Sequence, residues 1–216
     1  MGYNTSWILV DEITEQALYD CLDLAPTGET PDRYDLGTSY VPLAGAILKS
    51  GWCGVFAKYA LVMDATVGKS PIRLTRLPAK SRCITCVVLE HAMVSYASLW
   101  QDGHPAWEIR HDSSHGRSHL EARGDLPAVF KELCDTAMKK QRAEDAHDKP
   151  SDWGVDYVFD VPINTAASIA GYRHDRVVEE NFFKALRTLA PANGNVLTKL
   201  NEPPGWWQTV GSINYE

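Results

Sequence analysis

The sequence predicts an α+β protein with a mainly antiparallel sheet and helices packed on one face. Two observations lead to this class. The clearest connection between two apolar segments is a tight hairpin, and helical segments alternate with strand-like segments only in part of the chain. A regular strand–helix alternation, which would indicate a parallel sheet, is missing.

The first third of the chain begins with an apolar strand over Trp7–Val10. Apolar residues then recur at helical spacing, and acidic side chains precede them at the positive end of the helix dipole, which predicts a helix from about Thr14 to Leu24. A polar loop with two prolines follows. The stretch Tyr40–Tyr59 reads as two strands around Lys49-Ser50-Gly51.

The middle of the chain predicts a run of paired strands. Ile84–Leu89 is apolar and rich in β-branched residues, and Met93–Trp100 is a further strand. Asp102-Gly103 favours a two-residue turn because such turns need positive φ. The chain then returns as a strand over Ala106–His111, whose Trp107, Ile109 and His111 share one face.

The last part of the chain predicts three helices and one strand. Asp125 is a natural N-cap for a helix that extends to Met138 and ends in a polar linker over 141–152. Alternating apolar residues predict a strand over Val155–Val161. A short helix over Pro162–Ala170 stops at Gly171, and a last helix is expected over Val177–Ala190.

The length and composition are those of an ordinary globular protein. With 216 residues, 44% hydrophobic and 23% charged, we expect one domain over 1–216. Half-lobes over 1–78 and 79–190, with an aromatic tail over 201–216, are a subdivision that the element order allows.

The charge argues against a nucleic-acid partner. The formal net charge is −7 and the isoelectric point is near 5.5, whereas nucleic-acid-binding proteins usually carry a basic excess. One short basic stretch contains Arg73, Arg76, Lys80 and Arg82, and we interpret it as a solvated loop. Residues 1–70 carry nine acids against four bases, which would attract a basic partner surface.

Cysteine usage and hydropathy predict a cytoplasmic protein. Five widely spread cysteines, an odd number, do not resemble a disulfide framework and favour a reducing compartment. No stretch approaches the roughly 20 apolar residues that cross a bilayer, so we expect no membrane partner. A secretory signal is likewise not expected.

Histidines gather after the hairpin. His111, His115 and His119 are spaced by four and would share one helix face, as metal ligands do. Serines and a glycine between them favour a loop instead, in which case the histidines are simply solvated. The cofactor, if there is one, is left open.

His111 is also a candidate general base. It ends the inward face of its strand, Asp112 follows it, and a second Arg-His-Asp tripeptide supplies His174. The alternative is a core histidine with satisfied hydrogen bonds.

Two further features are candidate sites. Cys53 lies between small residues and could be a nucleophile if an imidazole or helix N-terminus lowered its pKa, although a buried strand cysteine is the alternative. Trp206 and Trp207 in the tail are costly to expose, so we expect them to pack on the body or on a partner.

Two other motifs are weaker signals. Cys83-x-x-Cys86 lies in a predicted strand, where the two thiols point to opposite faces. Asp156 and Asp160 would stand roughly 13 Å apart on a strand, too far for a carboxylate pair.

Two functions remain open. Phosphate-binding loops, dinucleotide fingerprints, zinc-protease motifs and serine-hydrolase elbows are all missing from the sequence. The first hypothesis is a soluble intracellular binding or regulatory protein of the inhibitor or immunity type, acting through a protein partner or by self-association. The second is a small hydrolytic or metal-assisted enzyme built around His111, Asp112, His115 and His119, with Cys53 or His174 as helpers.

Overall fold

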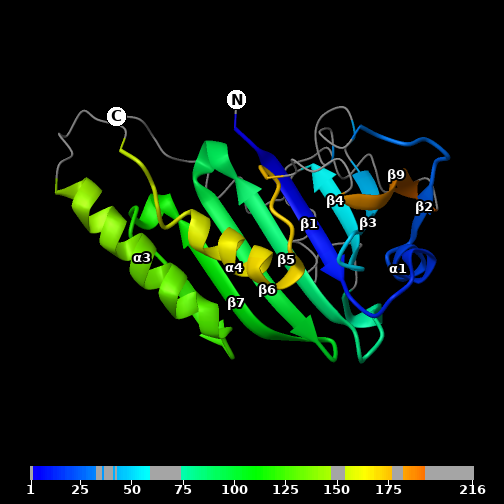
Figure 1. Ribbon diagram of the computed structural model, residues 1–216, viewed down its shortest axis with the longest axis horizontal. Helices are drawn as coiled ribbons and strands as arrows, with labels where there is room; N and C mark the ends of the chain where they lie inside the picture. Colours follow the sequence, from blue (N-terminus) through cyan, green and yellow to red (C-terminus); the bar gives the residue numbers. More distant parts are fainter. Residues whose placement is uncertain are drawn as a thin grey trace.

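A computed structural model places the described strands in one antiparallel sheet with the order β2-β9-β3-β4-β1-β5-β6-β7-β8 (Figure 1). The structure describes residues 2–32, 36, 41, 43–58, 74–146, 154–176 and 182–192. The helices are α1 (Glu15–Cys21), α3 (Ala128–Asp145) and α4 (Asp160–Ala170). The strands are β1 (Asn4–Val10), β2 (Leu24–Pro26), β3 (Leu43–Leu48), β4 (Cys53–Lys58), β5 (Arg82–Leu89), β6 (Val94–Gln101), β7 (His104–Asp112), β8 (Glu121–Gly124) and β9 (Phe183–Pro191). Short 3-10 turns are η2 (Leu74–Arg76), η3 (Glu90–Ala92) and η4 (Ser113–His115). The predicted α+β class with an antiparallel sheet is confirmed.

β1 lies in the centre of the sheet between β4 and β5. Its side chains alternate between two apolar clusters: Trp7 and Leu9 belong to one, and Ile8 and Val10 to the other. Both faces of the central sheet are therefore buried, which explains why the sequence of β1 is continuously apolar.

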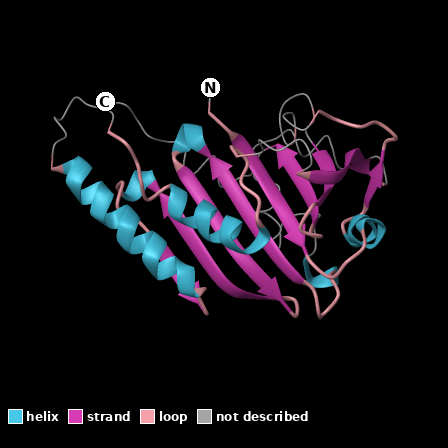
Figure 2. Ribbon diagram, in the orientation of Figure 1, coloured by secondary structure: helices cyan, strands magenta, loops and turns pink. Residues whose placement is uncertain are grey.

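Each face of the sheet has its own helical cover (Figure 2). α4 contributes Ile163 and Ala166 to the cluster that contains Trp7, and α3 packs beside α4 on the same face. α1 contributes Leu18 and Tyr19 to the cluster on the opposite face. The longer helices thus lie on one face, as predicted, while the short first helix covers the other.

Several local predictions match the structure because strong turn or capping signals mark them. Asp102 and Gly103 both take positive φ in the β6–β7 turn, and Gly171 ends α4 in the left-handed conformation. The hairpin around residues 49–51 joins β3 and β4. Within the described residues, no helix has the length and apolar character needed to cross a membrane.

The predicted strand over Val155–Val161 is wrong. The chain forms a loop there, and α4 begins at Asp160. Asp156 accepts hydrogen bonds from the backbone N–H groups of Val158 and Phe159, which starts a turn in place of an extended strand. The alternation of apolar and polar residues does not correspond to an alternation of burial either, because the consecutive residues Val158 and Phe159 are both buried.

The predicted helix over Val177–Ala190 is wrong in its described part. Residues 183–191 form β9, which pairs with β3 on one side and β2 on the other. The free edge of β3 takes β9 as a partner, so tertiary pairing overrides the helical spacing of Leu186 and Leu189. Residues 177–181 lie outside the described residues.

The predicted linker over 141–152 also differs at its start. α3 continues to Asp145, and Gln141 is completely buried. The side-chain amide of Gln141 donates to Asp145 and to the backbone oxygen of Val155, and it accepts from the N–H of Tyr157. Gln141 therefore connects the helix to the segment that precedes α4. Residues 147–153 lie outside the described residues.

Candidate functional site

His111 is a fully buried residue near the end of β7. Its Nδ1 donates to the backbone oxygen of His119 at 2.7 Å, and its Nε2 lies 2.9 Å from Asp156 Oδ2. His111 thus connects β7, the histidine-rich segment and the loop before α4.

Asp112 is buried beside it and is held by its own segment. Its carboxylate accepts from the Ser114 backbone and hydroxyl, and from Arg110 at 2.8 Å. Burial acts to raise the pKa of Asp112, but the hydrogen bonds from Ser114 and Arg110 outweigh it and hold the pKa below 3.8. Asp112 is an ionised anchor for the turn and not a proton donor.

The three histidines proposed as metal ligands are near one another but are differently engaged. His119 Nδ1 accepts the N–H of Asp112, so its Nε2 carries the proton and faces Glu121 Oε1 at 3.3 Å. His115 is exposed, with Nδ1 3.6 Å from Asp112. The ring centroids of His115 and His119 are 5.0 Å apart, and those of His111 and His119 6.3 Å. Within the described residues, no three His, Cys, Asp or Glu side chains are placed to hold a metal ion.

Cys53 lies in the opposite half of the sheet. Its Sγ bonds to the backbone oxygen of Ile13 at 3.2 Å, and burial raises the pKa of its thiol. A raised pKa disfavours the thiolate that a nucleophile needs. All five cysteines are unpaired, and Cys83 and Cys86 belong to the clusters on opposite faces, as their odd spacing predicts.

The second Arg-His-Asp tripeptide follows α4. Arg173 is 9% exposed and donates to Asp175, to Asn164 and, at 2.9 Å, to Asp160. Burial opposes the charge of Arg173, but these carboxylates outweigh it and raise its pKa. The guanidinium therefore holds Asp160 in place at the first turn of α4.

His174 is buried between aromatic rings. Its ring centroid lies 4.7 Å from that of Tyr3 and 5.7 Å from that of Trp7. Burial lowers its pKa below 6.5 against the opposing effects of Asp175 and Glu90. Its Nε2 is 3.8 Å from Glu90 Oε1, longer than a hydrogen bond, so the neutral ring leaves the Glu90 charge largely uncompensated.

Both tripeptides adjoin the same segment, 156–160. His111 holds Asp156 and has its ring 6.2 Å from that of Phe159, while Arg173 holds Asp160. Ser95 also donates to the Phe159 backbone oxygen. The entry to α4 is therefore fixed from both sides.

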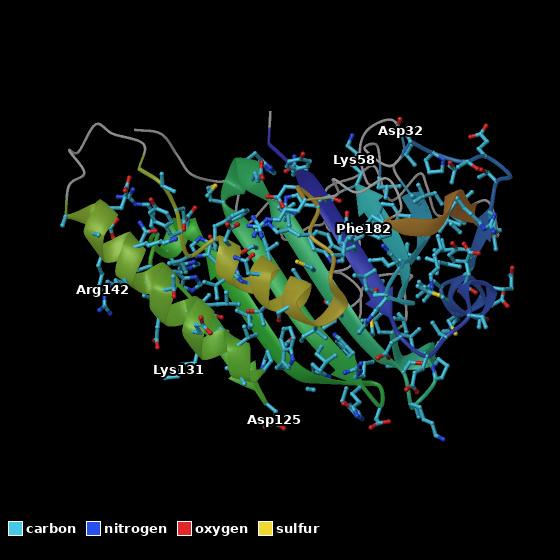
Figure 3. All side chains as sticks on the ribbon, viewed as in Figure 1. Asp32, Lys58, Asp125, Lys131, Arg142 and Phe182 are labelled. Atoms are coloured by element: carbon cyan, nitrogen blue, oxygen red, sulfur yellow. The ribbon has the colours of Figure 1, made fainter. Side chains whose placement is uncertain are left out.

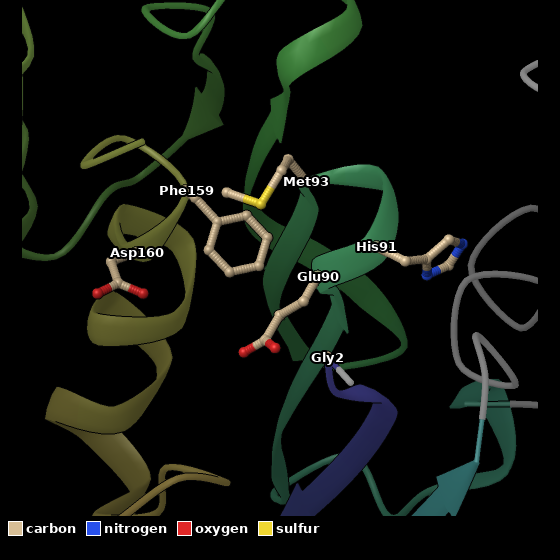
Figure 4. A pocket seen from close by; sticks show the side chains of 6 residues that line it. All are labelled: Gly2, Glu90, His91, Met93, Phe159 and Asp160. Carbon is tan, nitrogen blue, oxygen red and sulfur yellow. The ribbon is translucent and has the colours of Figure 1, made fainter. Parts of the chain in front are cut away.

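A pocket opens at this fixed segment. It has a cavity volume of about 470 Å³ and is lined by Gly2, Glu90, His91, Met93, Phe159 and Asp160. Figure 4 shows the Phe159 ring between the carboxylates of Glu90 and Asp160, with the Met93 thioether above the ring. We call these six residues the acidic–aromatic pocket.

The backbone of the first residues shapes one wall of this pocket. The Tyr3 N–H donates to Glu90 Oε2 at 2.8 Å, and a Cβ on Gly2 would come within 2.8 Å of the Glu90 Cβ. Glu90 is thus held by the Tyr3 backbone just before β1, and Asp160 by Arg173. Both carboxylates are positioned, yet their side chains remain 34% and 42% exposed.

Two other predicted features remain, the tryptophan pair of the tail and the short basic stretch. Trp206 and Trp207 lie outside the described residues. Of the basic stretch, Arg76 pairs with Asp23 and Arg82 with Asp11. These two cations are therefore engaged with acids of the N-terminal part of the chain.

Sequence reasoning missed the residues of the acidic–aromatic pocket. Glu90 and Met93 belong to η3 and its end, whereas Asp160 begins α4, and no motif joins the two segments. Asp156 is the local signal at the entry to α4, because its carboxylate accepts from the N–H groups of Val158 and Phe159. Comparison with protein-family models, with curated proteins and with solved structures finds no match for this chain.

Proposed function

We propose that the protein is a binding protein that acts in the cytoplasm by occupying a protein partner, in the manner of inhibitors and immunity proteins. The acidic–aromatic pocket is the observation that carries the proposal. It receives a lysine or arginine side chain from the partner.

The charge balance of the pocket favours a cation. Among the described residues, the carboxylates of Glu90 and Asp160 line the pocket. Asp160 pairs with Arg173, but this guanidinium is shared with Asp175 and also donates to Asn164. His174 adds no compensating charge at neutral pH because its pKa is lowered. An incoming cation therefore meets an excess of negative charge.

The shape and the apolar lining favour a cation on an aliphatic stem. A volume of about 470 Å³ falls within the usual range of about 300–1,000 Å³ for small-ligand pockets. The Phe159 ring and the Met93 thioether can contact the methylenes of a lysine or arginine, and the ring face also attracts the charge by about 0.5–2 kcal/mol. One side chain contributes only modest affinity, so the partner needs further contacts around the pocket.

The contacts of the histidine-rich segment favour this role over the enzyme hypothesis. Both ring nitrogens of His111 and of His119 already have partners within the chain. Cys53, with a raised thiol pKa, and His174, inside the aromatic cluster, belong to other parts of the fold. The proposed helpers Cys53 and His174 therefore lie apart from the histidine-rich segment.

Photo-crosslinking tests the proposal in cells that make the protein. A photoreactive residue at position 91, in the wall of the pocket, should crosslink to a partner segment that contains lysine or arginine. The same residue at position 102, in the turn at the far end of β6, is the matched control. Millimolar acetyl-arginine methylamide should suppress the first crosslink. Crosslinks that lack a basic residue, or that resist this competitor, would contradict the proposal.

A further inference from the structure

β8 is the last strand of the sheet, and no described segment pairs with its outer side. Its four residues are all exposed. The chain runs from the histidine-rich segment through β8 and then into α3, which begins at Ala128.

The direction of the backbone groups in β8 follows from two hydrogen bonds. Ser113 donates to Met93 O on the β6 side of β7, and Asp125 donates to Ala106 O on the β8 side. Because these directions alternate along a strand, Glu121 and Arg123 bond inward to β7. The N–H and C=O of Ala122 therefore point outward, where a further strand would bind them.

The side chains of this edge are self-complementary. If a second copy of β8 pairs antiparallel about Ala122, Glu121 of each copy lies opposite Arg123 of the other copy. Both charged positions of the strand then face the opposite charge. Within the described residues, neither Arg123 nor Asp125 has an ion-pair partner, and Asp125 extends from the start of α3 (Figure 3).

This pairing also continues a charge pattern that is already present in the sheet. Glu108 is opposite Arg123, and Arg110 is opposite Glu121, in the β7–β8 register. With the second copy, one row across four strands consists of Glu108, Arg123, and then Glu121 and Arg110 of the second copy, so acids and bases alternate along it. Opposite charges at directly paired positions stabilise antiparallel strands, and like charges oppose them.

α3 offers a second, independent feature beside this edge. Val129 and Leu133, one turn apart, are half-buried but belong to none of the apolar clusters among the described residues. Because α3 follows β8 directly, pairing of two β8 strands brings the two copies of α3 together. Val129 and Leu133 are the apolar positions available for that contact.

We propose that the protein forms a two-fold symmetric homodimer in which the β8 strands of two copies pair antiparallel about Ala122 and join the two sheets. This dimer is independent of the acidic–aromatic pocket, which lies at the entry of α4. Failure of the dimer would leave the proposed binding function untouched.

Charge reversal and mixing test the proposed dimer. Sedimentation velocity of the wild-type chain should give twice the 24.0 kDa mass of one copy. Glu121→Arg and Arg123→Glu each place like charges opposite one another at both symmetric positions, so each should raise the dimer dissociation constant by about tenfold or more. An equimolar mixture restores Arg–Glu pairs at both positions and should recover a heterodimer. Lys80→Glu is the matched control for a charge change away from β8.

A proline at position 122 provides a test that does not depend on charge. Ala122→Pro removes the outward N–H and leaves the inward bonds of Glu121 and Arg123 to β7 in place, so the variant should be monomeric with an unchanged circular-dichroism spectrum. A wild-type monomer would overturn the proposal. A dimer that survives Ala122→Pro, or charge variants that mixing does not rescue, would overturn it as well.

Discussion

The buried pair between His111 and Asp156 should be among the most sensitive points of the fold. The His111 side chain is completely buried and that of Asp156 is 4% exposed. Asp156 accepts from Val158 N at 3.1 Å and from Phe159 N at 3.0 Å, in addition to its contact with His111. Asp156→Ala removes all three interactions at once.

The magnitude follows from what the substitution leaves behind. Breaking a buried pair by removing one partner costs about 3–5 kcal/mol, because the other group stays buried without compensation. We therefore expect Asp156→Ala to lower the free energy of unfolding by about 3–5 kcal/mol. Asp156→Asn keeps an acceptor for both backbone N–H groups and can donate to His111 Nε2, so it should cost only about 1–2 kcal/mol.

Urea unfolding followed by circular dichroism measures both values. The wild type, Asp156→Ala, Asp156→Asn and the exposed control Glu132→Ala should unfold with equal slopes, so that midpoint shifts report stability. The control should lie within about 0.5 kcal/mol of the wild type. If Asp156→Ala costs less than about 1 kcal/mol, the pair does not hold the entry of α4 and the reasoning about this site fails.

Three further results are expected. The pKa of His174 in the fold lies below 6.5, so its contribution to stability is complete above pH 6.5 and falls as the pH drops below it; His174→Gln should flatten this slope in pH-dependent urea titrations, and an unchanged slope would refute the assignment. Gly45→Ala would bring a Cβ within 1.9 Å of the buried Tyr19 hydroxyl, and a loss of at least about 1–3 kcal/mol in thermal unfolding is expected, whereas a neutral result would contradict this packing. Gly124 has φ +83 and a Cβ there would lie 2.1 Å from Ala106 O, so Gly124→Ala should speed amide hydrogen exchange in β8 while β1 stays protected.

The elements that the sequence predicted correctly are those with strong local signals. The Asp102-Gly103 turn and the Gly171 helix end each depend on the conformation of one or two residues. Such conformations are set by the residue type itself, so they can be predicted without knowledge of distant contacts.

The elements that sequence reasoning missed depend on distant partners. β9 forms because β3 offers it an open edge, and the loop before α4 forms because Asp156 is held by His111 from β7. The acidic–aromatic pocket combines the N-terminal segment, η3 and the start of α4, which are brought together only by the sheet order. A local sequence pattern carries no information about contacts between segments that are distant in the sequence.

Methionine methyl NMR tests the central claim, that the acidic–aromatic pocket binds a basic side chain, most directly. The chain has four methionines, and Met93 lines the pocket while Met138 lies on α3 as an internal reference. Titration of ¹³C-methyl-labelled protein with acetyl-arginine methylamide or acetyl-lysine methylamide should shift the Met93 signal and leave Met138 unchanged. Glu90→Gln should weaken this response, and the neutral acetyl-norleucine methylamide should give little of it. The claim would be contradicted if the Met93 signal did not shift with either cation, or if it shifted equally with the norleucine compound.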